Sequence, residues 1–377
     1  MAVAREAATM GSVATTIYLV DMAQRVLVPH EAVSAPPSPE LAIDGTVAGR
    51  AYRTERPVVS PADDGTTTLW LPLLDSAERY GVVRVDVAEP VTDEALTEWL
   101  AFTHLVGELA ANKSAYGDGI AKRRRTRAMT VAAELRWSMV PPLTFNGTNV
   151  TISGIMEPAY EIAGDTFDYA VNADTAHIAI IDAVGHGLEA SRIANLAVGA
   201  YRHSRRLDRG LADKYRAMDD ALAAEFGAER FATAQLAHLQ LSTGELQWLN
   251  AGHPEPIVSR RGRAVDLTAE VCLPVGMARD LGSEAVVQIT ALEPGDIVLF
   301  FTDGVVEARA PTGEEFGRER LADMFVRAVS TEQTPAETLR LLAHAVVDHQ
   351  AGVFQDDATL VLLVWNGPPV PRHGAGG

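Results

Sequence analysis

The stretch IAIIDAVGHGLEA, residues 178–190, decides the fold of the larger part of this 377-residue chain. Its first half is an unbroken apolar run, which predicts a buried strand, and this run ends on Asp182. Glycines follow at once in AVGHG, where the backbone can approach an ion or a substrate closely. Because aspartate disfavours strands and is rarely buried without a partner, a carboxylate at this place points to a site.

Three more aspartates lie where an apolar strand meets a turn. They are Asp165 in AYEIAGDTFDY (159–169), Asp303 in IVLFFTDGVVEA (297–308) and Asp356 in VFQDDATLVLLV (353–364). Gathered carboxylates favour hard cations, so we expect Mg²⁺ or Mn²⁺ rather than zinc. Two ions need one bridging carboxylate, for which Asp182 is the candidate, and the Ala183 carbonyl is a further candidate ligand. Two such ions activate a water for attack on phosphorus without any cysteine or serine nucleophile.

Composition narrows the class of protein. The formal charge of −18 argues against nucleic acid or an anionic membrane surface as the main partner. The single cysteine, Cys272, excludes an intrachain disulfide, and its apolar neighbours predict a buried side chain rather than a nucleophile. Since no apolar window reaches the length of a membrane span and no signal peptide is recognisable, we expect a cytoplasmic protein.

The chain divides into four predicted parts. Residues 1–113 predict a small α+β domain, with strands at 14–21, 67–74 and 80–87 and a closing helix that begins after Thr92. Residues 114–143 predict a helical connector, with one helix over 121–140 that ends before Pro141-Pro142. The basic run 122–127 in this helix is either a solvated helix face or a binding site for phosphate or an acidic partner. Residues 144–366 form the main domain, and the tail 367–377 is predicted to be disordered.

The main domain alternates blocks of strands with paired helices. Strands are predicted in TNVTISGIM, AHIAIIDA, TAQLAHLQL, ELQWLN, PIVS, AVVQITAL, DIVLFFT and DATLVLLVW, and helices at 188–206, 212–227, 317–329 and 334–350. Ser242-Thr243-Gly244 is a hairpin signal. Because the helices come in pairs rather than after every strand, a doubly wound sheet is disfavoured, and sheets covered by helix layers are expected.

Five motifs follow one another in this domain. They are AGD with Asp168, DAVGHG (182–187), NAGHP (250–254), TDGVVEA (302–308) and DDAT (356–359). In this order they resemble the motifs of the metal-dependent (PPM-type) serine/threonine protein phosphatases, in their bacterial SpoIIE-like branch. The resemblance covers residues from about 130 to 366.

The resemblance implies a fold, an activity and a set of ligands. The fold is an α-β-β-α sandwich of two antiparallel sheets flanked by helices. The activity is hydrolysis of phosphoserine or phosphothreonine on a protein, with an anti-sigma-factor antagonist as the suspected substrate, by a water activated between two Mg²⁺ or Mn²⁺ ions, or three. The implied ligands are the side chains of Asp165, Asp182, Asp303 and Asp356 and the carbonyl of Ala183, with Asp182 as the bridge.

Several residues near these ligands have open roles. His186 either donates a proton to the leaving oxygen or braces its loop, and Asp168 either supports the ion site or is a turn acid. Asp357 is a second candidate supporting carboxylate, and His253 is expected to be structural. The chain departs from the family pattern at Ala163, which replaces a glycine, and at Thr166-Phe167, where an aromatic pair is more usual.

The N-terminal domain resembles a GAF-type sensor domain, on the stretches GRAYRTERPVV (49–59) and LWLPLLDSAERYGVVRVDV (69–87). Docking or dimerisation is an equal alternative to ligand sensing, so a homodimer is one expectation. Two other functions stay open for the chain: a non-catalytic regulator built on the phosphatase fold, which need not bind metal, and a hydrolase of a small phosphorylated molecule.

Overall fold

The computed structural model describes residues 2–30, 38–61, 65–331 and 333–368, and its contacts divide the chain into two compact units. The first unit runs to Ala128 and the second begins at Met129. Within the described ranges, no helix is both long and apolar enough to cross a membrane. The tail expected to be disordered lies, from residue 369 on, outside the described residues.

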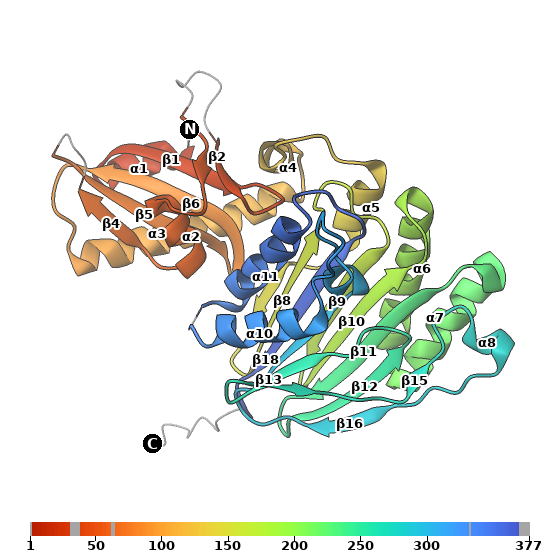
Figure 1. Cartoon of the computed structure of the whole chain (residues 1–377). Coiled ribbons are helices and arrows are strands. Elements are labelled where there is room, and N and C mark those ends of the chain that lie inside the picture. The colour runs from red at the N-terminus through yellow and green to blue at the C-terminus, as the bar shows by residue number, and fades with distance from the viewer. Residues whose placement is uncertain (1, 31–37, 62–64, 332, 369–377) are drawn as a thin grey trace, which may run out of the picture. The chain divides into compact units, whose positions relative to one another are not determined.

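The N-terminal unit is an antiparallel sheet of six described strands, in the order β3-β2-β1-β6-β5-β4 (Figure 1). The strands are β1 (Ser12–Val20), β2 (Val26–His30), β3 (Leu41–Ala42), β4 (Val58–Pro61), β5 (Thr67–Asp75) and β6 (Glu78–Val87). Its helices are α1 (Ala2–Thr9), α2 (Val47–Thr54), α3 (Asp93–Ser114) and α4 (Gly119–Arg124). The three strands and the helix predicted here are confirmed, and Thr92 caps α3 by accepting a hydrogen bond from the Ala95 N–H at 3.2 Å.

The helix expected to continue through the connector is interrupted. After α4 the chain becomes extended at Arg125, and a new helix, α5 (Val131–Met139), begins. Thr130 starts α5 by accepting a hydrogen bond from the Ala133 N–H at 3.1 Å, which is an N-cap that a continuous helix would not need. The prediction of one helix through this segment is therefore wrong. Helix α4 belongs to the first unit and α5 to the second.

The second unit is a sandwich of two sheets. One sheet, here called the β10 sheet, has the order β15-β12-β11-β10-β9, with β16 also paired to β12. Its strands are β9 (Asp165–Asn172), β10 (Thr175–Ala183), β11 (Ala232–Gln240), β12 (Glu245–Ala251), β15 (Val271–Cys272) and β16 (Gln288–Ala291). The other, the β18 sheet, has the order β14-β13-β17-β18-β8-β7. Its strands are β7 (Thr144–Asn146), β8 (Val150–Glu157), β13 (Ile257–Arg260), β14 (Arg263–Asp266), β17 (Ile297–Phe301) and β18 (Ala358–Trp365).

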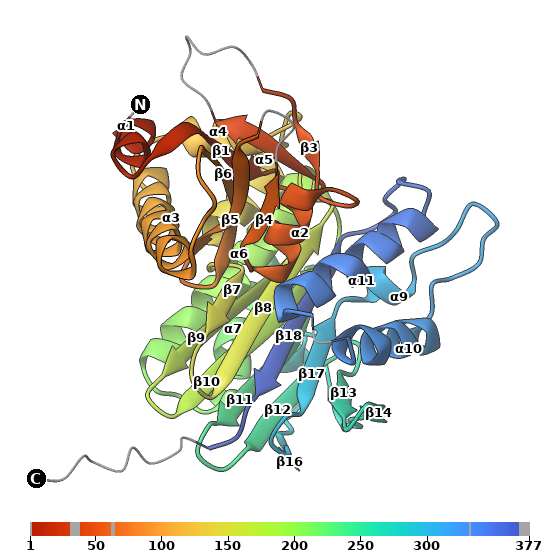
Figure 2. The same cartoon turned by 90° about the vertical axis from the view of Figure 1, so that its left-hand side faces the viewer.

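Helices cover the outer face of each sheet, as Figures 1 and 2 show. Helices α6 (Gly187–Arg206) and α7 (Leu211–Phe226) pack on the β10 sheet, and α10 (Arg318–Val329) and α11 (Pro335–His349) on the β18 sheet. The short helices are α8 (Ala278–Leu281), α9 (Asp303–Val306) and a 3-10 turn at Gly227–Glu229. The inner faces of both sheets meet in one apolar core that includes Phe167, Ile180, Trp248, Phe300 and Leu363. The predicted α-β-β-α sandwich is confirmed, with one parallel pair, β12 with β15.

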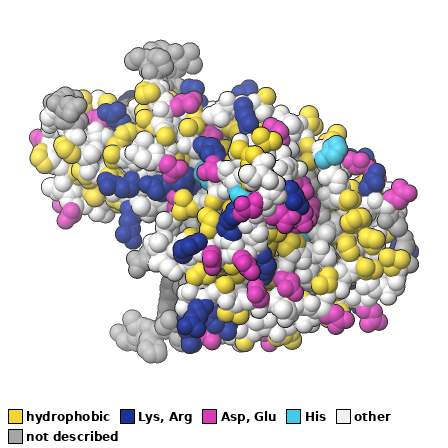
Figure 3. Space-filling view, in the orientation of Figure 1, with side chains coloured by type: hydrophobic (Ala, Val, Ile, Leu, Met, Phe, Trp, Pro, Cys, Tyr) yellow, Lys and Arg dark blue, Asp and Glu magenta, His cyan; other side chains and the backbone are white. Residues whose placement is uncertain are grey.

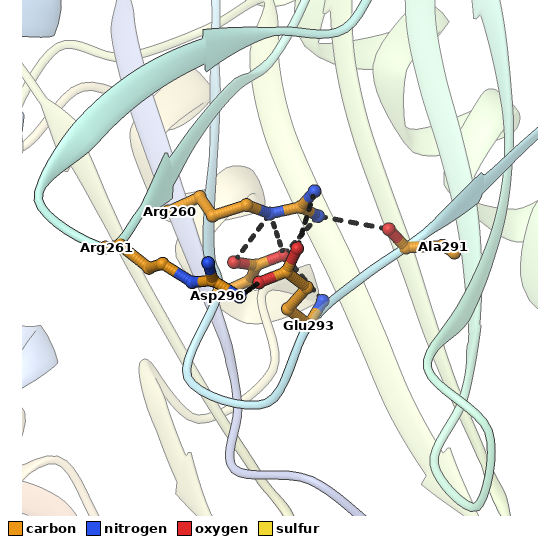
Figure 4. Close-up of polar contacts among 5 residues, drawn as sticks. All are labelled: Arg260, Arg261, Ala291, Glu293 and Asp296. Carbon is orange, nitrogen blue, oxygen red and sulfur yellow. Dashed lines mark hydrogen bonds and ion pairs between the residues drawn. The ribbon is translucent and has the colours of Figure 1, made fainter.

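A buried ion pair fixes the chain where it enters β17 (Figure 4). The Asp296 carboxylate is almost fully buried, and Arg260 on β13 donates to both of its oxygens from Nε, at 3.1 and 3.0 Å. The same guanidinium donates to the Ala291 carbonyl at 3.0 Å. This pair ties the β13–β14 hairpin to β17, the strand that leads to Asp303.

Candidate functional site

Two of the predicted ligands lie opposite each other on neighbouring strands. Asp182 near the end of β10 is paired in register with Asp165 at the start of β9. Alternate residues of a strand share a face, so Asp182 points to the same side as Ile180, and Asp165 to the same side as Phe167. Both apolar residues belong to the core between the sheets. The two carboxylates therefore lie at the edge of the space between the two sheets.

The other two predicted ligands come from the facing sheet. Asp303 is the first residue of α9, just after β17, and Asp356 lies two residues before β18. Burial raises the pKa of Asp182 to about 7, and the charges of Asp303 and Asp356 act in the same direction. Burial likewise raises the pKa of Asp303, with Asp356 adding to the effect. The sandwich thus brings carboxylates from both sheets into one electrostatic neighbourhood.

Asp165 is the most deeply buried of the four carboxylates, with only 1 % of its surface exposed. Burial raises its pKa well above the ordinary value, and the charges of Asp182 and Asp357 act in the same direction. Within the described ranges, no lysine or arginine forms an ion pair with any of the four candidate ligands. A cluster of carboxylates that offers oxygen ligands and forms no ion pair with a described lysine or arginine fits hard divalent cations.

The four carboxylates do not form a finished cage. Among the residues that the structure describes, no three histidine, cysteine, aspartate or glutamate side chains converge closely enough to enclose an ion. Like charges repel, and a bound cation would draw these carboxylates closer together. On the face shown in Figure 3, acidic side chains are scattered, with one denser cluster near the centre of the view. Asp356 is exposed and Asp182 and Asp303 are half-buried, so the site is open to solvent.

The Ala183 carbonyl lies against Gly164. A Cβ built on Gly164 would come within 2.7 Å of this oxygen, so only glycine permits the approach. The Ala183 N–H in turn donates to the Gly164 carbonyl at 3.3 Å. The preceding residue, Ala163, replaces a glycine of the family pattern, and its methyl group is buried in the structure. That departure is therefore accommodated.

Asp357 holds the turn that leads into Asp165. Its Oδ2 accepts hydrogen bonds from three consecutive backbone N–H groups, at 2.8 Å from Ala163, 2.8 Å from Gly164 and 3.3 Å from Asp165. Its own backbone carbonyl lies so close to Gly304 that a Cβ there would meet it at 2.0 Å. Asp357 thus links the loops that present Asp165 and Asp303.

Thr302 is a positioning residue to which the sequence analysis gave no role. Its hydroxyl donates to Asp165 Oδ2 at 2.6 Å and accepts from the Thr359 N–H at 2.9 Å. Both partners are buried, so the bond fixes one carboxylate oxygen of Asp165 in place. The only signal in the sequence is its place directly before Asp303.

Asp168 lies on the other face of β9 from Asp165. Its carboxylate accepts from Arg202 Nε and Nη2 on α6, at 2.9 and 2.7 Å, and also pairs with Arg205. Three residues along a strand reverse the direction of the side chain, so Asp168 faces the helix layer. It fastens α6 to the sheet, and the structure does not bring it to the other carboxylates.

The two histidines of the motifs occupy different environments. His186 is exposed just before α6, between two glycines with positive φ, and within the described residues its ring forms no hydrogen bond that would brace the loop. His253 is buried, and its Nδ1 lies 2.7 Å from the Thr233 hydroxyl. Its backbone exchanges hydrogen bonds with the Asn250 side chain, at 2.7 and 2.8 Å. His253 therefore has the structural role expected of it.

Arg136 on α5 is a second residue that the sequence analysis missed. Its guanidinium is fully buried, and its Nη2 donates to the Asn195 side chain on α6. Burial lowers its pKa to about 10, while the charges of Asp357 and Asp165 act in the opposite direction. One positive charge therefore lies behind the carboxylates, where it offsets part of their repulsion.

Comparisons with known proteins agree with this geometry. The family model for Stage II sporulation protein E (SpoIIE) matches residues 172–366, slightly more than half of the chain. Asp182, Asp303 and Asp356 lie inside the match, and Asp165 lies before it.

Two curated proteins and one solved structure are among the relatives. Protein IcfG of Synechocystis sp. is 26 % identical over 249 residues, which cover 57 % of this chain and 38 % of that protein. Phosphoserine phosphatase RsbU of Bacillus subtilis is 23 % identical over 237 residues, 62 % of this chain and 68 % of RsbU. The SiaA-PP2C domain of Pseudomonas aeruginosa is 20 % identical with a TM-score of 0.52, and the match covers 68 % of this chain and 99 % of that one. This last likeness shows the fold.

Proposed function

Since this chain belongs to the SpoIIE family and has a PP2C-type phosphatase fold, we propose that it hydrolyses phosphoserine or phosphothreonine on a protein. One observation supports this most: two sheets deliver four carboxylates to one solvent-open edge, where no lysine or arginine of the described chain pairs with them. Such a set of ligands suits Mg²⁺ or Mn²⁺.

The ion ligands in this proposal are the side chains of Asp165, Asp182, Asp303 and Asp356 with the Ala183 carbonyl. Asp182 would be the bridge, because its charge acts on Asp165 of the same sheet and the charges of Asp303 and Asp356 from the facing sheet act on it. Bound ions supply a water of lowered pKa and positive charge for the phosphoryl oxygens. Thr302 fixes Asp165, and Asp357 fixes the turn before it.

The residues of the chain do not favour a covalent route through a thiol. Cys272 is buried in β15, its Sγ accepts from the Val286 N–H at 3.2 Å, and burial raises its pKa. A raised pKa keeps the thiol protonated and unreactive. His186 is exposed three residues after Ala183 in the chain, and it is the candidate proton donor for the leaving oxygen.

The substrate in this proposal is a phosphorylated anti-sigma-factor antagonist. The support is the family resemblance and the similarity to RsbU, whose name describes a phosphoserine phosphatase. The openness of the carboxylate edge is compatible with a phosphorylated side chain on a folded protein, because Asp356, Val184 and Leu188 around it are exposed.

The test is phosphate release from phosphorylated antagonist proteins and from a small phosphate ester, with purified full-length protein and Mn²⁺. The proposal expects release from a phosphoprotein and little from the small ester. Preference for the ester would favour a small-molecule hydrolase instead. A protein that neither binds Mn²⁺ nor releases phosphate would support a non-catalytic regulator.

We further propose that the N-terminal unit regulates this activity, as a GAF-like sensor or as a dimerisation domain. Its six-stranded sheet with helices on both faces is compatible with either role. A truncated chain that begins at Met129 should then lose regulation but keep the carboxylate edge, which lies wholly in the second unit. The cytoplasmic location stays a prediction.

A further inference from the structure

A polar cavity lies at the opposite end of β10 from Asp182. It has a volume of about 420 Å³ and is lined by the start of β10, by β11 and by the segment that leads into α7. His177 in its wall is five residues before Asp182, which is about 16 Å along a strand. The cavity is therefore separate from the carboxylate edge, although one strand reaches both.

The cavity is lined by a buried lysine. The chain has only three lysines, Lys113, Lys122 and Lys214, and Lys214 is the one in the second unit. Its side chain is 1 % exposed. Its Nζ donates to the Arg209 carbonyl at 2.7 Å and lies 2.7 Å from His238 Nε2.

Among the described residues, Lys214 finds no anionic partner. Within the described part of the chain no carboxylate lies at ion-pair distance from its Nζ, and both of its hydrogen-bond partners are neutral. Burial lowers its pKa to about 8, the charge of Arg205 acts in the same direction, and Asp208 opposes it. A buried cation without a counter-charge costs free energy, which an anion beside it would recover.

Two neutral histidines add hydrogen-bonding capacity. His177 and His238 are paired in register across β10 and β11, with ring centroids 4.5 Å apart. Burial lowers their pKa values to about 4 and about 3, so both rings are uncharged at neutral pH. His177 Nδ1 is buried and has no hydrogen-bond partner in the described part of the chain, although buried polar atoms normally have one.

The lining charges limit what kind of anion fits. Arg209 and Gly210 line the cavity at the start of α7, where the helix dipole favours negative charge, part of which Asp213 in the first turn already supplies. Asp208 and Glu245 are exposed lining residues of the opposite sign. They disfavour a polyanion but leave room for one charged group next to Lys214.

From this geometry we infer that the cavity binds a small molecule with a single oxyanion group, a carboxylate or a phosphate, which pairs with Lys214 and Arg209. The site is independent of the proposed phosphatase chemistry. Lys214 and Arg209 would recognise a phosphate and a carboxylate in the same way, so the experiment tests each class of ligand separately.

The test uses the full-length protein labelled with [ε-¹³C]lysine, stripped of divalent ions by dialysis, in ¹H–¹³C correlation spectra. Three lysine signals are expected, assigned with Lys113→Arg and Lys122→Arg. Inorganic phosphate should shift the Lys214 signal until the site is saturated. It should also raise the pH midpoint of the Lys214 titration from near 8 by about one unit, which corresponds to about tenfold tighter phosphate binding by the ammonium form than by the neutral amine. Acetate forms the second arm, and sodium chloride at equal ionic strength is the control.

Lys113 and Lys122, which are exposed, should not respond in either arm. A Lys214 signal that ignores both anions, or three signals that move alike, would overturn the inference. The exposed Arg209 gives a second variant that leaves the core intact: Arg209→Gln should weaken the phosphate effect at least about 5-fold, a loss typical of one charge-assisted bond. Arg206→Gln, exposed and outside the cavity lining, should respond as the wild type does, and equal affinities in both variants would contradict the role of Arg209.

Discussion

The Thr302 hydroxyl donates a 2.6 Å hydrogen bond to Asp165, a residue 137 positions earlier in the chain. Thr302 follows β17 of one sheet, and Asp165 begins β9 of the other. The bond is therefore a direct polar link between the two halves of the sandwich, and it includes one of the four candidate ion ligands.

Replacing Thr302 with valine removes this donor while keeping the shape of the side chain. The hydrogen bond lowers the pKa of Asp165, so its loss leaves that carboxyl more readily protonated and less well oriented. We expect the Kd for Mn²⁺, measured by titration calorimetry, to rise about 10- to 100-fold. Thr302→Ser keeps the hydroxyl and should stay within a few-fold of the wild type, and a serine variant as weak as the valine one would argue against the bond.

Changing Asp182 to asparagine removes the proposed bridging carboxylate. The amide is nearly isosteric, so the fold should persist, while Mn²⁺ binding and phosphate release should both fall by more than about 100-fold, beyond the loss typical of residues that only orient ligands. The matched control is Asp213→Asn, on the exposed face of α7. Wild-type turnover by the Asp182 variant would refute the assignment of the site.

Asp168 should behave as a structural residue. Its carboxylate is 1 % exposed and pairs with Arg202 and Arg205, so Asp168→Asn leaves buried guanidinium charge unpaired. We expect a loss of about 3–5 kcal/mol in the free energy of unfolding, measured in urea. The Mn²⁺ affinity of the folded variant should be unchanged. A large loss of affinity would instead indicate that Asp168 supports the ion site.

The histidine pair should make the protein sensitive to acid. His238 has a folded pKa of about 3 and an unfolded value near 6.5, so between these limits the unfolded chain binds more protons. Its contribution to stability is thus complete above pH 6.5 and is lost as the pH falls towards 3, at about 1.4 kcal/mol per pH unit at most. The urea midpoints of unfolding measured at pH 7 and pH 5 should differ less in His238→Gln than in the wild type. An equal difference in both proteins would contradict this prediction.

Local patterns in the sequence predicted sheets covered by helix layers and four aspartates at strand ends, whereas the two-sheet sandwich was expected from the family resemblance. The role of Asp168 could also have been predicted from the sequence. Side chains three residues apart on a strand point to opposite faces, so Asp168 had to face away from Asp165. The hydrogen bond from Thr302 to Asp165 could not be predicted from the sequence, because it depends on how two sheets, formed by distant parts of the chain, pack together. Arg136 was missed for a related reason: the sequence does not say which face of α5 is buried near the carboxylates.

The division of the carboxylates between the two sheets has a consequence for how the protein matures. Neither layer alone holds more than half of the set, so a chain with every strand formed but the layers slipped by one residue would lack the site. Affinity for Mn²⁺ is thus a readout of correct layer alignment. A folding intermediate would therefore not bind the ion until its two sheets pack in their native alignment.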